Sequence, residues 1–214
     1  KAEMEIVEFD AVDILTASAM EADGYRQIMS YVTEGRTVAF VGSSGVGKST
    51  LIRRLLEAAD LTVGGFYTKM DESPKEVMHP IYIYPAKQPI TERKRLQKNL
   101  IGRCGEFGRR KESFPAVFDT LGREYLEDTQ GCQVIVMDEL GFMESEAYAF
   151  RSAVLRALDS DVPVLAAVKD KQGVPFLQQV RQHPQAEVFA INAENREELF
   201  ARLLPLVKDW KRNA

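Results

Sequence analysis

The chain reads Gly42-Ser43-Ser44-Gly45-Val46-Gly47-Lys48-Ser49-Thr50 between an apolar segment and an amphipathic one. The first eight of these residues fit the pattern G-x-x-x-x-G-K-[ST] at every position. Residues 37–41 before them are mostly apolar, as in a strand that is buried on both faces. Residues 48–59 after them place apolar side chains at helical spacing. A strand that runs through a glycine-rich turn into a helix is the setting in which this pattern binds phosphate.

Residues 42–50, the phosphate loop, have a chemistry that explains their composition. Glycines tolerate backbone angles that side chains disfavour, so successive N–H groups can turn inward towards an anion. Lys48 would supply a point charge to the β- and γ-phosphates of a nucleotide, and the Ser49 hydroxyl would be a ligand of Mg²⁺. The sequence therefore predicts a site for a nucleoside triphosphate, ATP or GTP, together with Mg²⁺.

A second motif ends an apolar strand, because Val134-Ile135-Val136-Met137 runs directly into Asp138-Glu139. Ligands of open α/β sheets bind at the carboxyl ends of the strands, so we expect these carboxylates beside the phosphate loop. Asp138 can hold Mg²⁺, directly or through water, and Glu139 can orient or deprotonate an attacking water. The predicted catalytic residues are therefore Lys48, Asp138 and Glu139.

Apolar segments alternate with helical patterns along the rest of the chain, which predicts an α/β fold with a mainly parallel sheet flanked by helices. Further strands are expected at 63–67, 81–84, 134–137, 162–168 and 187–191, and further helices near 120–129, 145–158, 175–182 and 194–206. Residues 1–36 precede the first strand of this fold. We therefore expect an N-terminal arm over 1–36 and a P-loop domain over 37–214.

Composition sets limits on the class of protein. The net charge of −4 argues against a surface that binds nucleic acid throughout. Cys104 and Cys132 are the only cysteines and have no C-x-x-C spacing, which excludes a cysteine-rich zinc site and favours a reducing compartment. No run approaches the ~20 apolar residues that span a bilayer. We expect a cytoplasmic protein with no membrane partner, and its oligomeric state stays open.

Seven segments resemble one known family: GSSGVGKST (42–50), GGFYTK (64–69), NLIGRCG (99–105), FDTLGREYL (118–126), VIVMDELGFME (134–144), PVLAAVKDK (163–171) and NAENREELF (192–200). In this order they look like the thermophile-type nucleoside triphosphatases, which include the cancer-related nucleoside-triphosphatase. The resemblance implies Mg²⁺-dependent hydrolysis of ATP, GTP and other nucleoside triphosphates. The division of roles between Asp138 and Glu139 also resembles the RecA-like P-loop ATPases that carry an additional catalytic glutamate, the ASCE class.

The segment 14–52 is similar to the junction in circularly permuted ribosome-assembly GTPases. There a guanine-contacting SA motif precedes the phosphate loop, and Ala17-Ser18-Ala19 would contain that motif. The chain departs from these GTPases because no N-K-x-D motif lies upstream. Asp119-Thr120-Leu121-Gly122 also has leucine where their D-x-x-G switch usually has proline. A GTP-dependent switch or ribosome-associated GTPase stays an alternative function.

Residues 92–112 hold eight lysines and arginines against three glutamates. They are interpreted as a solvated loop and helix face, or as the source of an arginine finger, in which Arg103 or Arg109 reaches the γ-phosphate. They could also form the lid of a small-molecule or nucleoside kinase, a second alternative function, or contact nucleic acid. Arg196 begins the last predicted helix and is a candidate for contacting the base or the phosphates.

Overall fold

The computed structural model describes residues 37–72, 77–105 and 111–211. The arm expected over residues 1–36, with its SA motif at 17–19, lies outside these residues, so its likeness to a GTPase receives no support. The strands are β1 (Thr37–Gly42), β2 (Val63–Met70), β3 (Met78–Pro85), β4 (Leu100–Gly105), β5 (Lys111–Ser113), β6 (Val134–Leu140), β7 (Val164–Lys169) and β8 (Ala186–Ala190).

The helices that border the sheet are α2 (Lys48–Ala59), α3 (Pro115–Val117), α4 (Arg123–Glu127), α5 (Tyr148–Leu158), α6 (Pro175–Arg181) and α7 (Arg196–Trp210). Single 3-10 turns form η1 (Ile90–Glu92) and η2 (Gln97–Asn99), and a π-helical stretch, η4 (Phe118–Gly122), joins α3 to α4. None of the helices in the described ranges is both long and apolar enough to cross a membrane.

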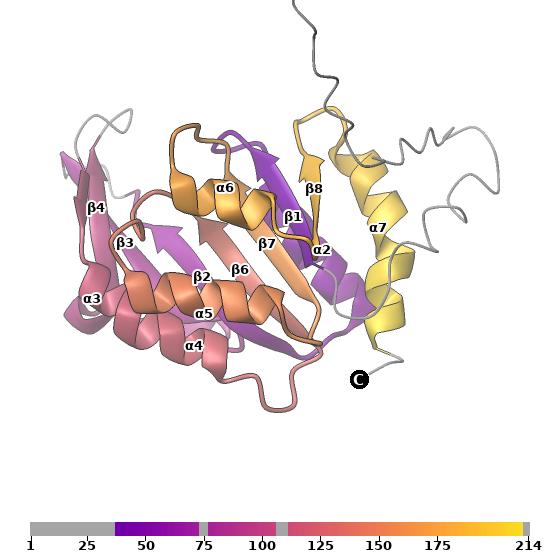
Figure 1. The fold of residues 1–214 in the computed structure, drawn as a ribbon, viewed down its shortest axis with the longest axis horizontal. Coiled ribbons are helices and arrows are strands. Elements are labelled where there is room, and N and C mark those ends of the chain that lie inside the picture. Colours follow the sequence, from indigo (N-terminus) through magenta and orange to yellow (C-terminus); the bar gives the residue numbers. More distant parts are fainter. Residues whose placement is uncertain (1–36, 73–76, 106–110, 212–214) are drawn as a thin grey trace, which may run out of the picture. The chain divides into compact units, whose positions relative to one another are not determined.

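The strands of the described residues form one sheet of eight, in the order β5-β4-β3-β2-β6-β7-β1-β8 (Figure 1). The neighbours β2, β6, β7, β1 and β8 run parallel, whereas β3, β4 and β5 continue the sheet antiparallel. This arrangement confirms the predicted α/β class with a mainly parallel sheet. A single strand, β7, separates β1 from β6, so the two motifs that follow these strands lie at the same edge.

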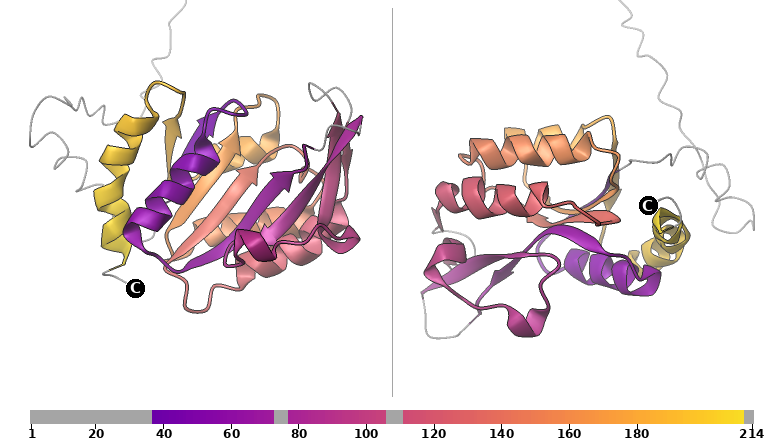
Figure 2. Two further views of the ribbon diagram at one scale, coloured as in Figure 1. Left: turned by 180° about the vertical axis from the view of Figure 1, so that it is seen from behind. Right: turned by 90° about the horizontal axis from the view of Figure 1, so that it is seen from below.

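Helices cover both faces of the sheet: α4, α5 and α6 lie on one face, and α2 and α7 lie on the other (Figures 1 and 2). Between the sheet and α5 the core is rich in phenylalanine. The ring of Phe150 lies 5.4 Å from that of Phe66 and 5.2 Å from that of Phe118, centroid to centroid. All three side chains are at most 2% exposed, so this contact fixes α5 against the central strands.

Strands β4 and β5 correct one interpretation of the basic segment 92–112. That segment is not only a loop and a helix face, because residues 100–105 pair with β3 and residues 111–113 pair with β4. Leu100 and Ile101 are 3% and 2% exposed. Two apolar residues among charged neighbours are too short a run to reveal a strand by periodicity.

The helix expected near 120–129 lies instead at 115–127 and includes the π-helical stretch η4. Gly122, the last residue of η4, lies against Phe150, where a Cβ atom would approach the ring to 2.8 Å. The close approach of this ring explains a glycine inside a helical segment. The expected strands and the other expected helices are present, with bounds that differ by a few residues.

Candidate active site

The phosphate loop has the backbone conformation that its glycines suggested. Gly45 and Gly47 have φ angles of 85° and 99°, in the left-handed region that disfavours side chains. Helix α2 begins at Lys48, and no side chain caps its first turn. The first N–H groups of α2 therefore have no side-chain cap. Together with the helix dipole, these groups favour the binding of an anion.

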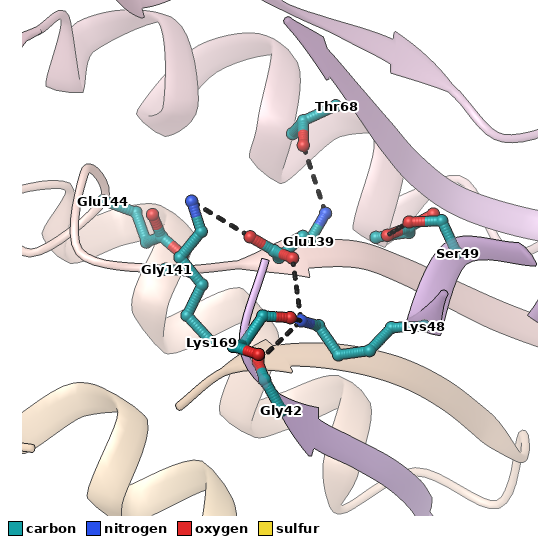
Figure 3. Close-up of polar contacts among 10 residues, drawn as sticks. Gly42, Lys48, Ser49, Thr68, Glu139, Gly141, Glu144 and Lys169 are labelled. Atoms are coloured by element: carbon teal, nitrogen blue, oxygen red, sulfur yellow. Dashed lines mark hydrogen bonds and ion pairs between the residues drawn. The ribbon is translucent and has the colours of Figure 1, made fainter. Parts of the chain in front are cut away.

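Lys48 runs back along the loop and is only 3% exposed. Its Nζ donates hydrogen bonds to the carbonyl oxygens of Gly42, at 2.7 Å, and Ser43, at 2.9 Å (Figure 3). The same Nζ lies 3.4 Å from Oε2 of Glu139. The ammonium group is thus held at the junction between the phosphate loop and the acidic end of β6.

Ser49 and Asp138 meet directly, although they are 89 residues apart in sequence. The Ser49 hydroxyl donates a hydrogen bond of 2.7 Å to Oδ1 of Asp138. Asp138 is 4% exposed, and this burial raises its pKa to about 6, against the effect of the Ser49 hydrogen bond. Removal from water explains the shift, because it disfavours the charged carboxylate.

This pair of oxygen atoms fits Mg²⁺, which takes oxygen ligands in proteins. Among the described residues, no group of three or more His, Cys, Asp and Glu could hold a metal ion alone. Mg²⁺ at nucleotide sites is held by one or two protein oxygens, with phosphates and water as the remaining ligands. A serine hydroxyl beside one carboxylate meets that requirement.

Glu139 leaves the regular pairing of β6. The register of β6 against β7 shifts between Asp138 and Leu140, and the Glu139 N–H donates a 3.2 Å hydrogen bond to Oγ1 of Thr68. Its carboxylate lies between two ammonium groups, 3.4 Å from Lys48 Nζ and 3.1 Å from Lys169 Nζ (Figure 3). The second carboxylate therefore faces the lysine of the phosphate loop.

Arg196 lies at the phosphate loop, whereas Arg103 does not. A Cβ atom on Gly47 would lie 2.6 Å from Nη1 of Arg196, so this guanidinium is packed against the loop. Arg103 forms an ion pair with Glu112 at 2.9 Å, and its strand β4 is separated from β6 by β3 and β2. Arg109, the other arginine considered for the γ-phosphate, lies outside the described residues.

Three residues near the site were not predicted as site residues from the sequence: Thr68, Lys169 and Arg93. Thr68 and Lys169 belong to segments that carried the family resemblance, but neither fits a general phosphate-site motif. The Arg93 guanidinium lies over the rings of Tyr67, at 4.8 Å, and Tyr84, at 5.6 Å. Burial lowers the pKa of Arg93, and the charge of Asp138 is among the influences that oppose this shift. Only the fold brings these side chains to the site.

The phosphate loop after β1, the carboxylates at the end of β6 and the strand order together define a P-loop nucleotide-binding fold. A family model described as "NTPase" matches residues 37–204, which is most of the chain. The chain therefore belongs to this NTPase family, as the resemblance predicted.

Curated relatives agree with this assignment over nearly their whole length. The chain is 31% identical over 181 residues to nucleoside-triphosphatase THEP1 of Methanopyrus kandleri, with 81% of this chain and 96% of that protein covered. It is 30% identical over 173 residues to nucleoside-triphosphatase THEP1 of Thermotoga maritima, with 80% and 95% covered.

Two solved structures share the fold. THEP1 from the hyperthermophile Aquifex aeolicus superposes with a TM-score of 0.61 at 22% identity, covering 80% of this chain and 99% of that one. A human cancer-related nucleoside triphosphatase gives a TM-score of 0.57 at 22% identity, with 81% and 98% covered. At this identity the likeness concerns the fold alone.

Proposed function

We propose that the chain hydrolyses nucleoside triphosphates to the diphosphate and phosphate, with Mg²⁺ and with both ATP and GTP as substrates. The observation that carries this proposal is the meeting of the phosphate loop with two carboxylates, through Ser49 and Asp138 at 2.7 Å and through Lys48 and Glu139 at 3.4 Å. Membership of the NTPase family and the names of the curated relatives support the same reaction.

The phosphate loop binds the substrate in this proposal. Backbone N–H groups of residues 42–50 hold the phosphate chain, and Lys48 exchanges its carbonyl partners for the β- and γ-phosphates. Ser49 and Asp138 would hold Mg²⁺, which neutralises charge on the phosphates when it is bound. Arg196, packed against Gly47, is placed to contact the phosphates or the base.

Glu139 orients the attacking water and accepts a proton from it. The water oxygen bonds to the γ-phosphorus, the bond from that phosphorus to the β,γ-bridging oxygen breaks, and the nucleoside diphosphate leaves with the electron pair. A carboxylate suits this role because phosphoryl transfer needs a positioned nucleophile more than a strong base. The hydrogen bond from the Glu139 N–H to Thr68 fixes the backbone that carries the carboxylate.

The breadth of substrate and the setting are also proposals. The relatives are named for nucleoside triphosphates without a particular base, which supports acceptance of ATP and GTP. The family match begins at residue 37, which supports a domain over 37–214 preceded by an arm over 1–36. Cys104 and Cys132 are free thiols, which fits a cytoplasmic location.

The Mg²⁺ requirement is tested by phosphate release from ATP and from GTP, with Mg²⁺ or with a chelator, by the wild type and by Asp138→Asn. The wild type should release phosphate from both nucleotides with Mg²⁺ only. Asp138→Asn should need a higher Mg²⁺ concentration for its half-maximal rate, because the buried carboxylate that would bind the ion has lost its charge. Asp161→Asn, at an exposed carboxylate, is the matched control and should behave as the wild type.

Two results of this experiment would overturn the proposal. Equal release in the presence of the chelator would remove Mg²⁺ from the reaction, and release from GTP alone would favour the GTPase alternative. In a separate assay with an added acceptor, formation of ADP and phosphorylated acceptor without free phosphate would favour a small-molecule or nucleoside kinase instead of a hydrolase.

A further inference from the structure

Lys169 stands at the end of β7, the strand between the two motifs. Its register partner on β1 is Gly42, the first residue of the phosphate loop. On the other side of β7, the bulged end of β6 carries Glu139, and Lys169 Nζ lies 3.1 Å from Oε1 of that carboxylate. The side chain thus begins beside the phosphate loop and ends at the carboxylate that would orient water.

The two oxygens of the Glu139 carboxylate have different lysine partners. Lys48 Nζ is near Oε2, at 3.4 Å, and Lys169 Nζ is near Oε1, at 3.1 Å (Figure 3). The two ammonium groups are therefore no farther apart than the width of the carboxylate plus one contact on either side of it. A γ-phosphate that is held by Lys48 and faces Glu139 is therefore also within reach of Lys169.

The stem of Lys169 is held in place by the turn that follows Glu139. A Cβ atom on Gly141 would lie 3.3 Å from its Cδ, and its Nζ lies 5.3 Å from the centroid of the Phe142 ring. The side chain is one-third exposed, so solvent reaches part of it. The Lys169–Glu139 ion pair is partly open to solvent, at 33% and 20% exposure, and such a pair adds little to stability, so stability alone is a poor reason for this placement.

We propose that Lys169 is a catalytic cation of the site: one N–H of its ammonium group contacts an oxygen of the γ-phosphoryl group while another keeps Glu139 in place. A lysine ammonium has three N–H donors, so both contacts can form at once. Negative charge on the γ-phosphoryl oxygens and the leaving oxygen is what an arginine finger stabilises in related reactions. Lys169 supplies this charge from within the chain, in the role that the sequence suggested for Arg103 or Arg109.

This inference rests on the proposed hydrolysis and is tested with Lys169→Met and Lys169→Arg. Lys171→Met is the matched control, because Lys171 Nζ also lies near the Phe142 ring, at 4.6 Å, but belongs to a side chain that is exposed. For each protein, kcat and KM are measured with Mg·ATP. Dissociation constants are measured for Mg·ADP alone and for Mg·ADP with aluminium fluoride, which imitates the transferring phosphoryl group.

Lys169→Met should lower kcat by about 100-fold, the usual loss when one donor to a developing charge is removed. It should weaken the aluminium fluoride complex by a similar factor and leave the affinity for Mg·ADP nearly unchanged. Lys169→Arg should recover most of the rate, and Lys171→Met should stay within about twofold of the wild type. The ratio of the two dissociation constants does not depend on how much of a variant is folded, so it separates catalysis from folding.

The inference is overturned if the wild type hydrolyses ATP and Lys169→Met does so within about threefold of its rate. An equal loss of Mg·ADP affinity, or an equal loss in Lys171→Met, would also overturn it, since Lys169 would then bind nucleotide generally or act only through surface charge. These results leave the proposed hydrolysis intact. Absence of phosphate release by the wild type would instead overturn both proposals.

Discussion

Asp138 and Glu139 are neighbours in sequence but lie in different surroundings. Asp138 is almost fully buried, and its pKa is raised to about 6. The Glu139 side chain is one-fifth exposed and lies between the ammonium groups of Lys48 and Lys169. A bound cation would compensate for the burial of the Asp138 carboxylate. The Glu139 carboxylate is partly exposed, so water can reach it.

Glu144 is a third carboxylate near the site, and it is fully buried in the turn after β6. It accepts a hydrogen bond from the Gly141 N–H. Burial raises its pKa from the ordinary value of 4.5 to about 7, although the Gly141 hydrogen bond and the nearby Lys169 favour the charged form. Between pH 4.5 and about 7, the folded protein therefore keeps a proton on Glu144 that the unfolded chain has released.

We expect Glu144 to make the free energy of unfolding fall as pH rises from about 5 to about 7.5. A folded pKa above the unfolded one stabilises the protein fully below the unfolded pKa and loses this effect as pH passes the folded pKa. Relative to Glu144→Gln, which cannot titrate, the wild type should lose up to about 3 kcal/mol across this range. Urea unfolding of both proteins at several pH values measures the difference, and a difference that does not vary with pH would contradict the assignment.

At the scale of single residues, the sequence pointed to those side chains of the proposed site that belong to a motif. Lys48 and Ser49 have fixed places in the loop pattern, and the acidic pair stands at a strand end, so their meeting could be expected. Lys169 could not be found in this way, because a lysine after a buried strand is common. Its role depends on β7 lying between β1 and β6, which no local pattern reveals.

At the scale of elements, the contact of β2 with β6 supports the acidic end of β6. Tyr67 on β2 is the register partner of Asp138, and Thr68 accepts the Glu139 N–H. Gly65 lets the two strands approach, because its φ is 85° and an added Cβ would lie 2.1 Å from the carbonyl oxygen of Val136. No side chain fits at this position without movement of β6.

Gly65→Ala should therefore destabilise the protein by about 2–4 kcal/mol, from left-handed backbone strain together with a forced displacement of backbone atoms. Gly131→Ala is the matched control: Gly131 also has a positive φ, of 72°, but nothing lies within 4 Å of its added Cβ. It should cost about 1 kcal/mol, the strain alone. Chemical unfolding of both variants gives the two values, and equal losses would show that the approach of β2 to β6 does not constrain Gly65.

Elements with long periodic patterns were predictable, and those with short or interrupted patterns were not. Helix α2 has the predicted bounds, residues 48–59, because its apolar face is continuous and glycines precede it. Strands β4 and β5 escaped prediction because their apolar content is brief and their neighbours are charged. Strand β4 pairs antiparallel with β3, and β5 pairs antiparallel with β4, so neither follows the strand–helix–strand logic that guided the rest.

At the scale of the whole molecule, strand order accounts for the site. The order β6-β7-β1 brings the ends of three parallel strands to one edge. Strand β6 carries the acidic pair near its end, β7 ends at Lys169, and β1 leads into the phosphate loop and Lys48. The parallel core was predictable, since alternating strands and helices allow few other arrangements. The antiparallel extension from β3 to β5 was not predictable. It contains Arg103, on β4, and so places this arginine several strands away from the phosphate loop.

The central claim is that the phosphate loop binds the nucleotide while Glu139 governs the water that attacks it. A single-turnover experiment, with enzyme in excess over Mg·ATP, tests this claim because it separates binding from chemistry. Glu139→Gln should bind Mg·ATP with a dissociation constant within about threefold of the wild type but convert it at least about 100-fold more slowly. Glu146→Gln, at an exposed carboxylate of the turn that follows β6, should convert it at the wild-type rate. Conversion by Glu139→Gln at the wild-type rate would contradict the account.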